Sequence, residues 1–157
     1  MTRQNLIILA AGGSAALLAG AFFFQALGWA PCQMCLWQRW PHAAAVAIGA
    51  LSFVAAPMQR LLCLAGALAA LTTAGIAGFH GGVERKWWEG PSSCTGSGDG
   101  LSGLSGNALL PGATDAPALV LCDTFTPFLL GLTMANWNMI ASVALAILWI
   151  MAARRDA

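Results

Sequence analysis

The charged residues of this chain are separated by four long gaps, which restrict the possible folds more than any other sequence feature. The charge-free stretches contain 35, 20, 23 and 30 residues. They lie between Arg3 and Arg39, Arg39 and Arg60, Arg60 and Glu84, and Asp123 and Arg154. A helix that crosses a bilayer needs ~20 mostly apolar residues. Each gap is therefore long enough to hold one membrane span.

The composition excludes several classes of protein. Only 8% of the residues are charged and 59% are hydrophobic, whereas an ordinary globular domain has roughly a quarter charged residues. A water-soluble single domain is therefore excluded, and so is a disordered chain, which needs low hydrophobicity and high net charge. The net charge of +1 provides no basic surface for nucleic acid, which is not expected as a partner.

We predict an all-α integral membrane protein, with residues 1–157 forming one membrane domain. The expected spans of this four-helix transmembrane bundle are about 6–27, 40–56, 61–79 and 128–151, because backbone polar groups in lipid need partners within the chain. The first apolar stretch exceeds the ~7–15 residues of a signal-peptide core, so we interpret it as an uncleaved span. Pro41 either begins the second span or kinks a helix that begins earlier.

The connections predict the orientation. An even number of spans places both termini and the turn 57–60 on one side, and connections 28–39 and 81–127 on the other. The first side carries four Arg residues, and the second carries three basic residues: Arg39, Arg85 and Lys86. The positive-inside rule therefore favours cytoplasmic termini. The long connection holds five of the six acidic residues, and Glu84 to Lys86 are expected at its solvated edge.

Four of the five cysteines lie in the two connections on the non-cytoplasmic side. These four are Cys32, Cys35, Cys94 and Cys122. Cys63 lies inside the third expected span, where a buried cysteine behaves as a small apolar residue. We therefore expect a structural role for Cys63 and redox chemistry, if any, at the other four.

Cys32 and Cys35 form a CxxC motif directly after Pro31. In soluble proteins this motif is typical of thioredoxin-like or zinc sites, but the chain has no βαβ pattern for a thioredoxin fold. A short disulfide ring is strained and exchanges readily, and a helix N-terminus favours a reactive thiolate. The alternative is a static disulfide, which would gain little from closing so short a loop.

Cys94 and Cys122, with 27 residues between them, form a second candidate pair. Alone, this pair would be interpreted as a structural crosslink in an oxidising compartment. Beside a CxxC on the same side of the membrane, it favours thiol–disulfide exchange between the two pairs. A zinc site with four cysteine ligands usually combines two closely spaced couples. Cys94 and Cys122 are not such a couple, so no metal is expected.

Arg39 follows Cys35 by one helical turn and lies at the mouth of the second expected span. An arginine that enters the membrane is costly and usually has a partner. It either extends to the interface beside Trp37 and Trp40 or places a fixed positive charge near Cys35, stabilising a thiolate or an anionic acceptor. Position alone does not distinguish these roles.

The pattern Pro-Cys-x-x-Cys-x-x-x-Arg at 31–39, followed by a long loop with two cysteines, resembles the DsbB family of bacterial inner-membrane disulfide oxidases. The segments Cys32-Gln-Met-Cys-Leu-Trp-Gln-Arg39 and Gly131-Leu-Thr-Met-Ala-Asn-Trp137 carry the resemblance. With the four spans it covers essentially the whole chain. It implies a transmembrane bundle with a long periplasmic loop and cytoplasmic N- and C-termini.

The resemblance also implies a mechanism. The loop disulfide Cys94–Cys122 would oxidise a periplasmic DsbA-type protein of thioredoxin fold, with Cys94 linked to that partner. Electrons would then pass to Cys32–Cys35 and on to ubiquinone or menaquinone from the membrane pool.

Three positions near the expected quinone site follow from the same resemblance. Cys35 would face the quinone and Arg39 would stabilise the developing charge. A histidine near the end of span three belongs to the family's quinone site, and His80 is the candidate here, although an interfacial histidine is an equal alternative. The chain departs from the family at Gln38, where the best-known members have an acidic residue. His42 is expected to be interfacial.

Two other functions are weighed. A vitamin K epoxide reductase-like enzyme is also a small helical bundle that uses four cysteines and a quinone, but its loop pair precedes the CxxC, whereas here the CxxC comes first. The other is a non-enzymatic membrane scaffold whose disulfides only hold loops, in which no cysteine transfers electrons.

Overall fold

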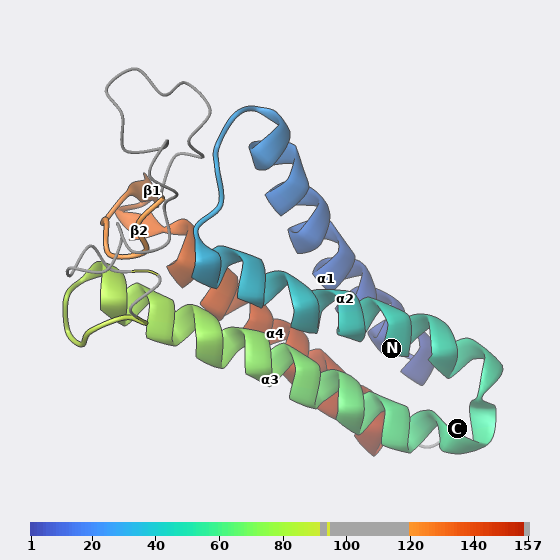
Figure 1. The fold of residues 1–157 in the computed structure, drawn as a ribbon. Helices are drawn as coiled ribbons and strands as arrows, with labels where there is room; N and C mark the ends of the chain where they lie inside the picture. The colour runs from blue at the N-terminus through green and yellow to red at the C-terminus, as the bar shows by residue number, and fades with distance from the viewer. Residues whose placement is uncertain (92–93, 95–119, 156–157) are drawn as a thin grey trace, which may run out of the picture.

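The computed structural model describes residues 1–91, 94 and 120–155, which form a bundle of four helices (Figure 1). The helices are α1 (Arg3–Ala26), α2 (Gln33–Val54), α3 (Gln59–Glu84) and α4 (Met134–Arg154), and a 3₁₀ turn, η1 (Ala56–Met58), joins α2 to α3. Most of the expected long connection, residues 92–93 and 95–119, lies outside the described residues.

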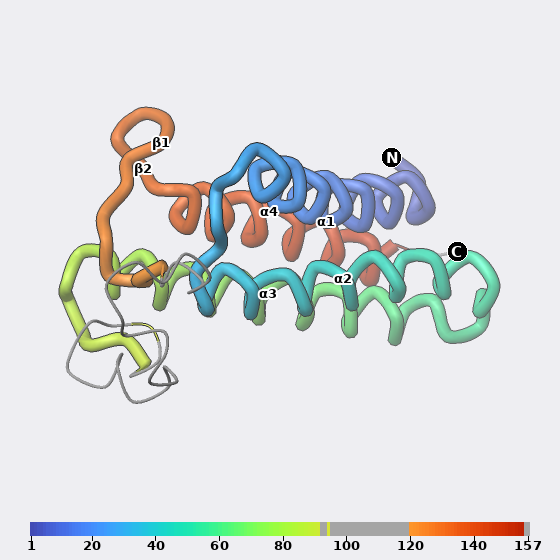
Figure 2. The backbone as a smooth tube through the Cα atoms, turned by 45° about the horizontal axis from the view of Figure 1, so that its top comes forward, coloured from blue at the N-terminus to red at the C-terminus, as the bar shows by residue number. Residues whose placement is uncertain are grey.

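The two ends of the bundle differ. Both termini and the η1 turn lie at one end, and the start of α2, the end of α3 and the start of α4 lie at the other (Figures 1 and 2). Helix α3 packs along α2 and α4, and α1 packs against α2 and α4. The bundle therefore gathers the start of α2 and the adjoining parts of the long connection at one end.

Helices α2 and α3 extend beyond the expected apolar spans. Helix α2 begins at Gln33, well before residue 40, and contains Pro41; it is capped by Cys32, whose Sγ accepts a hydrogen bond from the backbone N–H of Cys35 at 3.3 Å. Helix α3 continues past residue 79 to Glu84. The expected ranges followed apolarity, but these extra turns contain polar side chains that are buried between helices.

The apolar stretch before α4 forms a hairpin, although it was expected to belong to the fourth span. Strands β1 (Pro127–Leu129) and β2 (Leu132–Thr133) pair antiparallel. The two residues between them, Leu130 and Gly131, have φ values of 53° and 75°, and positive φ at both positions characterises a type I′ turn. Thr133 then caps α4, because its Oγ1 accepts a hydrogen bond from the N–H of Asn136.

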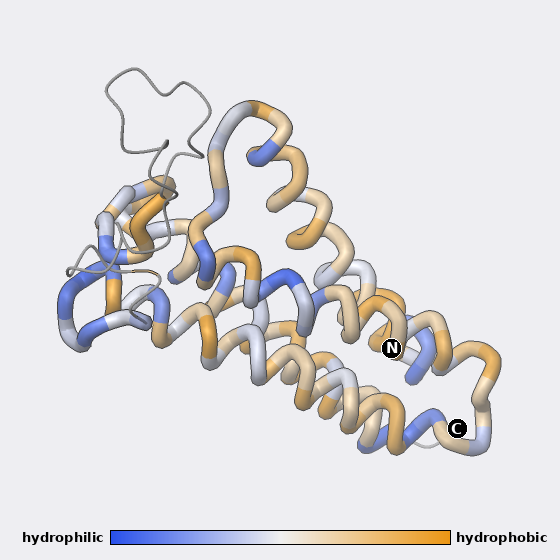
Figure 3. The backbone as a smooth tube through the Cα atoms, in the orientation of Figure 1, coloured by the Kyte–Doolittle hydropathy of each residue, from blue (hydrophilic) through white to orange (hydrophobic). Residues whose placement is uncertain are grey.

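Three of the described helical segments are long and apolar enough to cross a membrane: α1, residues 56–84 and α4. Large apolar side chains also point away from the bundle; on α3, Leu61, Leu64, Leu68 and Leu71 are 48–67% exposed. Apolar residues follow the helices along most of their length (Figure 3). An exposed apolar surface of this extent marks a membrane-contacting face, and the protein is a mostly helical membrane protein.

The main core lies where α1, α3 and α4 meet. Trp149 is fully buried there, together with Leu6, Ile7 and Cys63. Gly66 of α3 allows this close packing, because a Cβ at that position would lie 2.6 Å from the Trp149 ring. Cys63 is thus part of the core and lies outside the cysteine cluster described below.

Candidate functional site

Four cysteines from two distant parts of the sequence share one small cluster at the end of the bundle. Cys32, Cys94 and Cys122 are buried in it, and Cys35 packs against it. The backbone N–H of Cys122 donates to the carbonyl of Cys94 at 2.7 Å, which holds the two loop cysteines side by side. The structure therefore brings the four candidate redox cysteines together.

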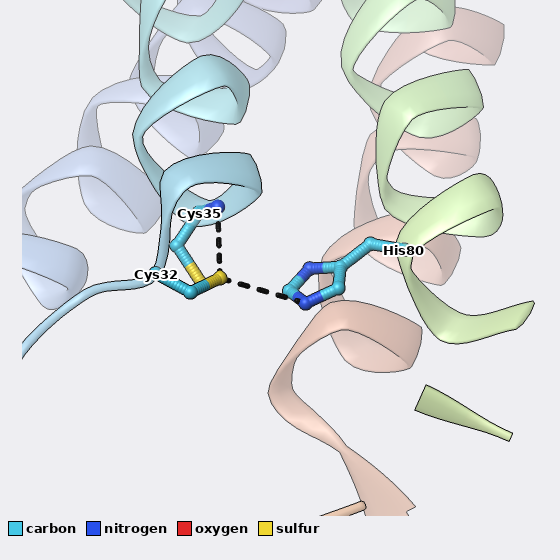
Figure 4. A group of neighbouring side chains, drawn as sticks. All are labelled: Cys32, Cys35 and His80. Carbon is cyan, nitrogen blue, oxygen red and sulfur yellow. Dashed lines mark hydrogen bonds between the residues drawn. The ribbon is translucent and has the colours of Figure 1, made fainter. Parts of the chain in front are cut away.

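The CxxC pair lies at the N-terminus of α2 (Figure 4). The two Sγ atoms of Cys32 and Cys35 are 2.8 Å apart. The hydrogen bond with the Cys35 sulfur, together with burial, raises the pKa of the Cys32 thiol. This direction disfavours the thiolate form of Cys32 relative to its thiol.

His80, from the last turns of α3, contacts this pair directly (Figure 4). Its Nε2 lies 3.6 Å from Sγ of Cys32 and 3.8 Å from Oε1 of Glu84, and its Nδ1 lies 3.1 Å from Nε2 of Gln38. The imidazole is 4% exposed. The structure thus places this candidate residue against the CxxC sulfurs, in the interior of the bundle.

Glu84 is buried, which corrects the expectation that it lies at a solvated loop edge. It is 7% exposed, and its Oε2 accepts a hydrogen bond of 2.6 Å from the hydroxyl of Thr133. A buried carboxylate requires such partners. The next two residues, Arg85 and Lys86, are exposed as expected.

His42 is also buried, not interfacial as expected. It is 4% exposed, and its Nε2 lies 3.0 Å from Oδ1 of Asn138 on α4. Asn138 in turn donates through Nδ2 to Oε1 of Gln38 at 2.7 Å. Neither His42 nor Asn138 was predicted to belong to the site. The sequence signal for these residues is a polar side chain inside an apolar span. Because buried polar groups are hydrogen-bonded, such a side chain implies a partner on another helix.

Arg39 connects α2 to α1. Its Nη1 donates to Oε1 of Gln25 at 2.6 Å, and its Nη2 donates to the carbonyl of Ala21 at 3.4 Å. The guanidinium also lies 4.8 Å from the centre of the Phe22 ring. Among the described residues its buried Nε has no hydrogen-bond partner, so one donor remains available.

A cavity of about 730 Å³ lies between α1, α2 and α4 next to the cysteines. Cys32, Cys35, Arg39 and His80 line it together with mostly apolar residues of α1 and α4. Volumes of this size, apolar walls and a few polar groups are typical of small-molecule sites. The cavity therefore offers a ligand access to the CxxC sulfurs and to Arg39 at the same time.

The sulfurs of Cys32 and Cys35 and a ring nitrogen of His80 also form the kind of group that can bind a metal ion. The three ligand atoms lie within 4.8 Å of one another. In a tetrahedral zinc site with Zn–S bonds of 2.3 Å, two sulfurs are about 3.8 Å apart. The 2.8 Å between these sulfurs is shorter, so a bound zinc ion would require the two sulfurs to move apart.

The fold and the site define a mostly helical membrane protein with a cluster of four cysteines at one end of the bundle. The sequence profile of the family described as "Disulfide bond formation protein DsbB" matches residues 3–152 of the 157. The chain therefore belongs to the DsbB family, which confirms the resemblance found in the sequence. No curated protein and no solved structure gave a match. Family membership implies a membrane oxidoreductase of disulfide-bond formation.

Proposed function

We propose that this protein is a quinone-dependent disulfide oxidase that reoxidises a periplasmic DsbA-type protein of thioredoxin fold. The observation that carries the proposal is the cluster of four cysteines beside an apolar cavity that also contains Arg39. One cysteine pair is contributed by the long connection and the other by the start of a helix. Such an arrangement suits exchange between a water-soluble thiol partner and a lipid-soluble acceptor.

Cys94 and Cys122 form the pair that reacts with the partner. The partner's thiolate attacks the Cys94 sulfur, the Cys94–Cys122 bond breaks, and the electron pair remains on Cys122. The partner's second thiol then releases Cys94 and completes the partner's disulfide. The proximity of the loop pair to Cys32 supports transfer of the two electrons to the Cys32–Cys35 disulfide by a second exchange.

The residues around the cavity fit a quinone. A bound ubiquinone or menaquinone would supply the two-electron acceptor, so that one partner dithiol and one quinone give one disulfide and one quinol. The free Nε–H of Arg39 suits a carbonyl oxygen, since a buried donor without a partner is costly. Cys35 lies on the cavity wall as the sulfur that faces the acceptor, and the apolar residues of α1 and α4 suit a ring with an isoprenoid tail.

We also propose that α2 is the fourth span. Its 22 residues, at 1.5 Å each, are about 33 Å long, enough to cross the ~30 Å core of a bilayer. The polar residues of its first half are paired inside the bundle, which reduces the cost of burying them. In this topology the termini are cytoplasmic and the redox cysteines are periplasmic, in the bacterial inner membrane.

The test is quinone reduction by the purified protein in lipid nanodiscs, supplied with a reduced DsbA-type protein. Wild-type protein should turn over, and Cys32→Ser and Cys35→Ser should each abolish turnover. Cys63→Ala is the matched control, because Cys63 lies in the core away from the cluster, and it should retain turnover. Undiminished turnover in either CxxC variant would contradict the cysteine relay, and a wild-type protein without turnover would favour the scaffold role.

A further inference from the structure

A chain of hydrogen bonds runs through the buried interior of the bundle from His42 to Cys32. Nε2 of His42 pairs with Oδ1 of Asn138 at 3.0 Å, and Nδ2 of Asn138 donates to Oε1 of Gln38 at 2.7 Å. Nε2 of Gln38 then pairs with Nδ1 of His80 at 3.1 Å, and Nε2 of His80 lies 3.6 Å from Sγ of Cys32. The chain thus joins α2, α4 and α3 to one of the CxxC sulfurs.

One backbone group fixes the direction of the whole chain. The Nε2 atom of Gln38 lies 3.1 Å from the carbonyl oxygen of Met34, and a carbonyl oxygen only accepts hydrogen bonds. The amide of Gln38 is therefore oriented with its NH₂ group toward Met34 and His80, and its oxygen toward Asn138. Asn138 must then donate to Gln38 through its NH₂ group and accept from His42 through its oxygen.

The same orientation determines the tautomer of His80. The NH₂ group of Gln38 has two hydrogens, one for the Met34 carbonyl and one for Nδ1 of His80. Nδ1 therefore accepts, and in a neutral imidazole the proton must then be on Nε2.

The surroundings of Nε2 agree independently with this assignment. Sγ of Cys32 and Oε1 of Glu84, which can both accept a hydrogen bond, lie 3.6 and 3.8 Å from Nε2. A proton on Nε2 therefore has acceptors. The contact of Nδ1 with the Gln38 amide is closer, at 3.1 Å, so Gln38 sets the tautomer.

We propose that Gln38 is a positioning residue that holds neutral His80 in the Nε2–H tautomer, so that this N–H donates to the Cys32 sulfur and stabilises its thiolate. All four hydrogen bonds of the chain point the same way, and aligned hydrogen bonds polarise one another. Carboxamides do not readily pass protons on, so the chain orients and strengthens the last N–H and does not conduct protons.

The relevance of this hydrogen bond rests on the proposed disulfide oxidase function. When the Cys32–Cys35 disulfide forms again, the Cys32 thiol loses its proton, and reduction of the quinone to quinol takes up the two protons and two electrons of the pair. The His80 Nε2 lies 3.6 Å from the Sγ on which the charge then develops, and the backbone N–H of Cys35 donates to the same sulfur at 3.3 Å. Hydrogen bonds to charged groups are the strong ones.

The direct test is the ring ¹⁵N NMR spectrum of the reduced full-length protein in nanodiscs at neutral pH. The chain has two histidines, so the spectrum contains two sets of ring signals, and His80→Asn assigns one set by its loss. We expect His80 to carry its proton on Nε2 alone. A proton on Nδ1, or on both nitrogens, would overturn the proposal.

Substitutions of Gln38 test whether this residue sets the tautomer. Gln38→Glu has only acceptor oxygens and should move the His80 proton to Nδ1, while the neutral Gln38→Met should leave a mixture of tautomers. The matched control is Thr73→Val, because the Thr73 hydroxyl donates to the backbone carbonyl of Gln38, at 3.2 Å, and not to its side-chain amide, so the tautomer should remain Nε2–H. If the spectrum is unchanged in both Gln38 variants, another group sets the His80 tautomer, and the proposed role of Gln38 is wrong.

A second readout follows the thiolate itself. In protein labelled with ¹³C at cysteine Cβ, titration of Cys32 should show about tenfold less thiolate in Gln38→Met than in wild type or Thr73→Val at the same pH. Equal titration curves would contradict the stabilising role of His80. Both readouts are independent of turnover, so an inactive wild-type protein would refute the oxidase function without affecting this test.

Discussion

The backbone N–H of Cys122 donates a 2.7 Å hydrogen bond to the carbonyl of Cys94. The two loop cysteines are therefore held together, and both lie in the cluster that contains Cys32. Because the two cysteine pairs are adjacent, a thiolate released from Cys94–Cys122 can reach the Cys32–Cys35 disulfide. The order of these exchanges can be tested.

Replacing Cys122 with Ser should trap the partner on Cys94. Cys122→Ser leaves Cys94 as a free thiol, so the partner is supplied without its second cysteine and with its remaining thiol activated as a disulfide with thionitrobenzoate. The Cys94 thiolate attacks the partner's sulfur, thionitrobenzoate leaves, and the partner has no second thiol to release Cys94. A mixed disulfide between Cys94 and the DsbA-type protein should therefore accumulate, detectable by non-reducing gel and peptide mass spectrometry. Cys94→Ser is the control and should give no such adduct. A partner linked through Cys35 would reverse the assignment.

Removing the Arg39 side chain should weaken quinone use and leave partner exchange largely intact. Arg39 lines the cavity and has a buried, unpaired Nε, and a charge-assisted hydrogen bond is worth about 1.5–3 kcal/mol. The KM for quinone should rise about tenfold or more in Arg39→Ala, measured by steady-state quinone reduction. The rate of mixed-disulfide formation in the Cys122→Ser background measures partner exchange separately.

Arg39→Lys separates charge from geometry. Lysine keeps the positive charge but lacks the planar guanidinium. It therefore cannot bond Gln25 and Ala21 through two nitrogens while a third nitrogen, Nε, is free to bond the quinone. We expect a KM between those of wild type and Arg39→Ala. If both variants have the wild-type KM, Arg39 is an interfacial cation without a role at the quinone.

Much of the fold follows from the sequence, because membrane helices are encoded by charge-free apolar length. The same signal misplaced the start of α4: Phe128, Leu129 and Leu130 are apolar, yet they belong to a hairpin. Only Gly131 is a typical turn residue there, since a leucine at φ 53° is unusual. A pattern of hydrophobicity alone cannot distinguish such a turn from the first turn of a helix.

The site was only partly predictable for a related reason. The CxxC, the loop cysteines and Arg39 were identified from residue type and spacing, and His80 was identified from the resemblance to the DsbB family. The burial of Gln38 and His42 was not, because their partners come from α3 and α4. Hydropathy evaluates each side chain singly, whereas the cost of burying an amide or imidazole depends on partners supplied by other helices.

Removing the Thr133 hydroxyl should destabilise the site end of the bundle. This hydroxyl caps α4 and donates to the buried carboxylate of Glu84 at 2.6 Å. Loss of a helix N-cap costs about 1 kcal/mol, and leaving a buried acceptor short of a partner adds about 1–3 kcal/mol. Thr133→Val should therefore lower the free energy of unfolding by about 2–4 kcal/mol in mixed-micelle denaturation. Thr133→Ser keeps the hydroxyl and should lose much less; equal losses would show that the methyl group, not the hydrogen bonds, is responsible.

Two glycines of α3 provide a matched test of helix packing. A Cβ at Gly66 would lie 2.6 Å from the ring of Trp149, which is fully buried, whereas a Cβ at Gly75 would meet nothing within 4 Å. Gly66→Ala should therefore force α3 away from α4 and cost about 1–3 kcal/mol. Gly75→Ala should be neutral or stabilising by up to about 1 kcal/mol, because alanine is the better helix former. Both values come from the same mixed-micelle denaturation. A Gly66→Ala protein as stable as Gly75→Ala would mean that α3 and α4 are not in such close contact around Trp149.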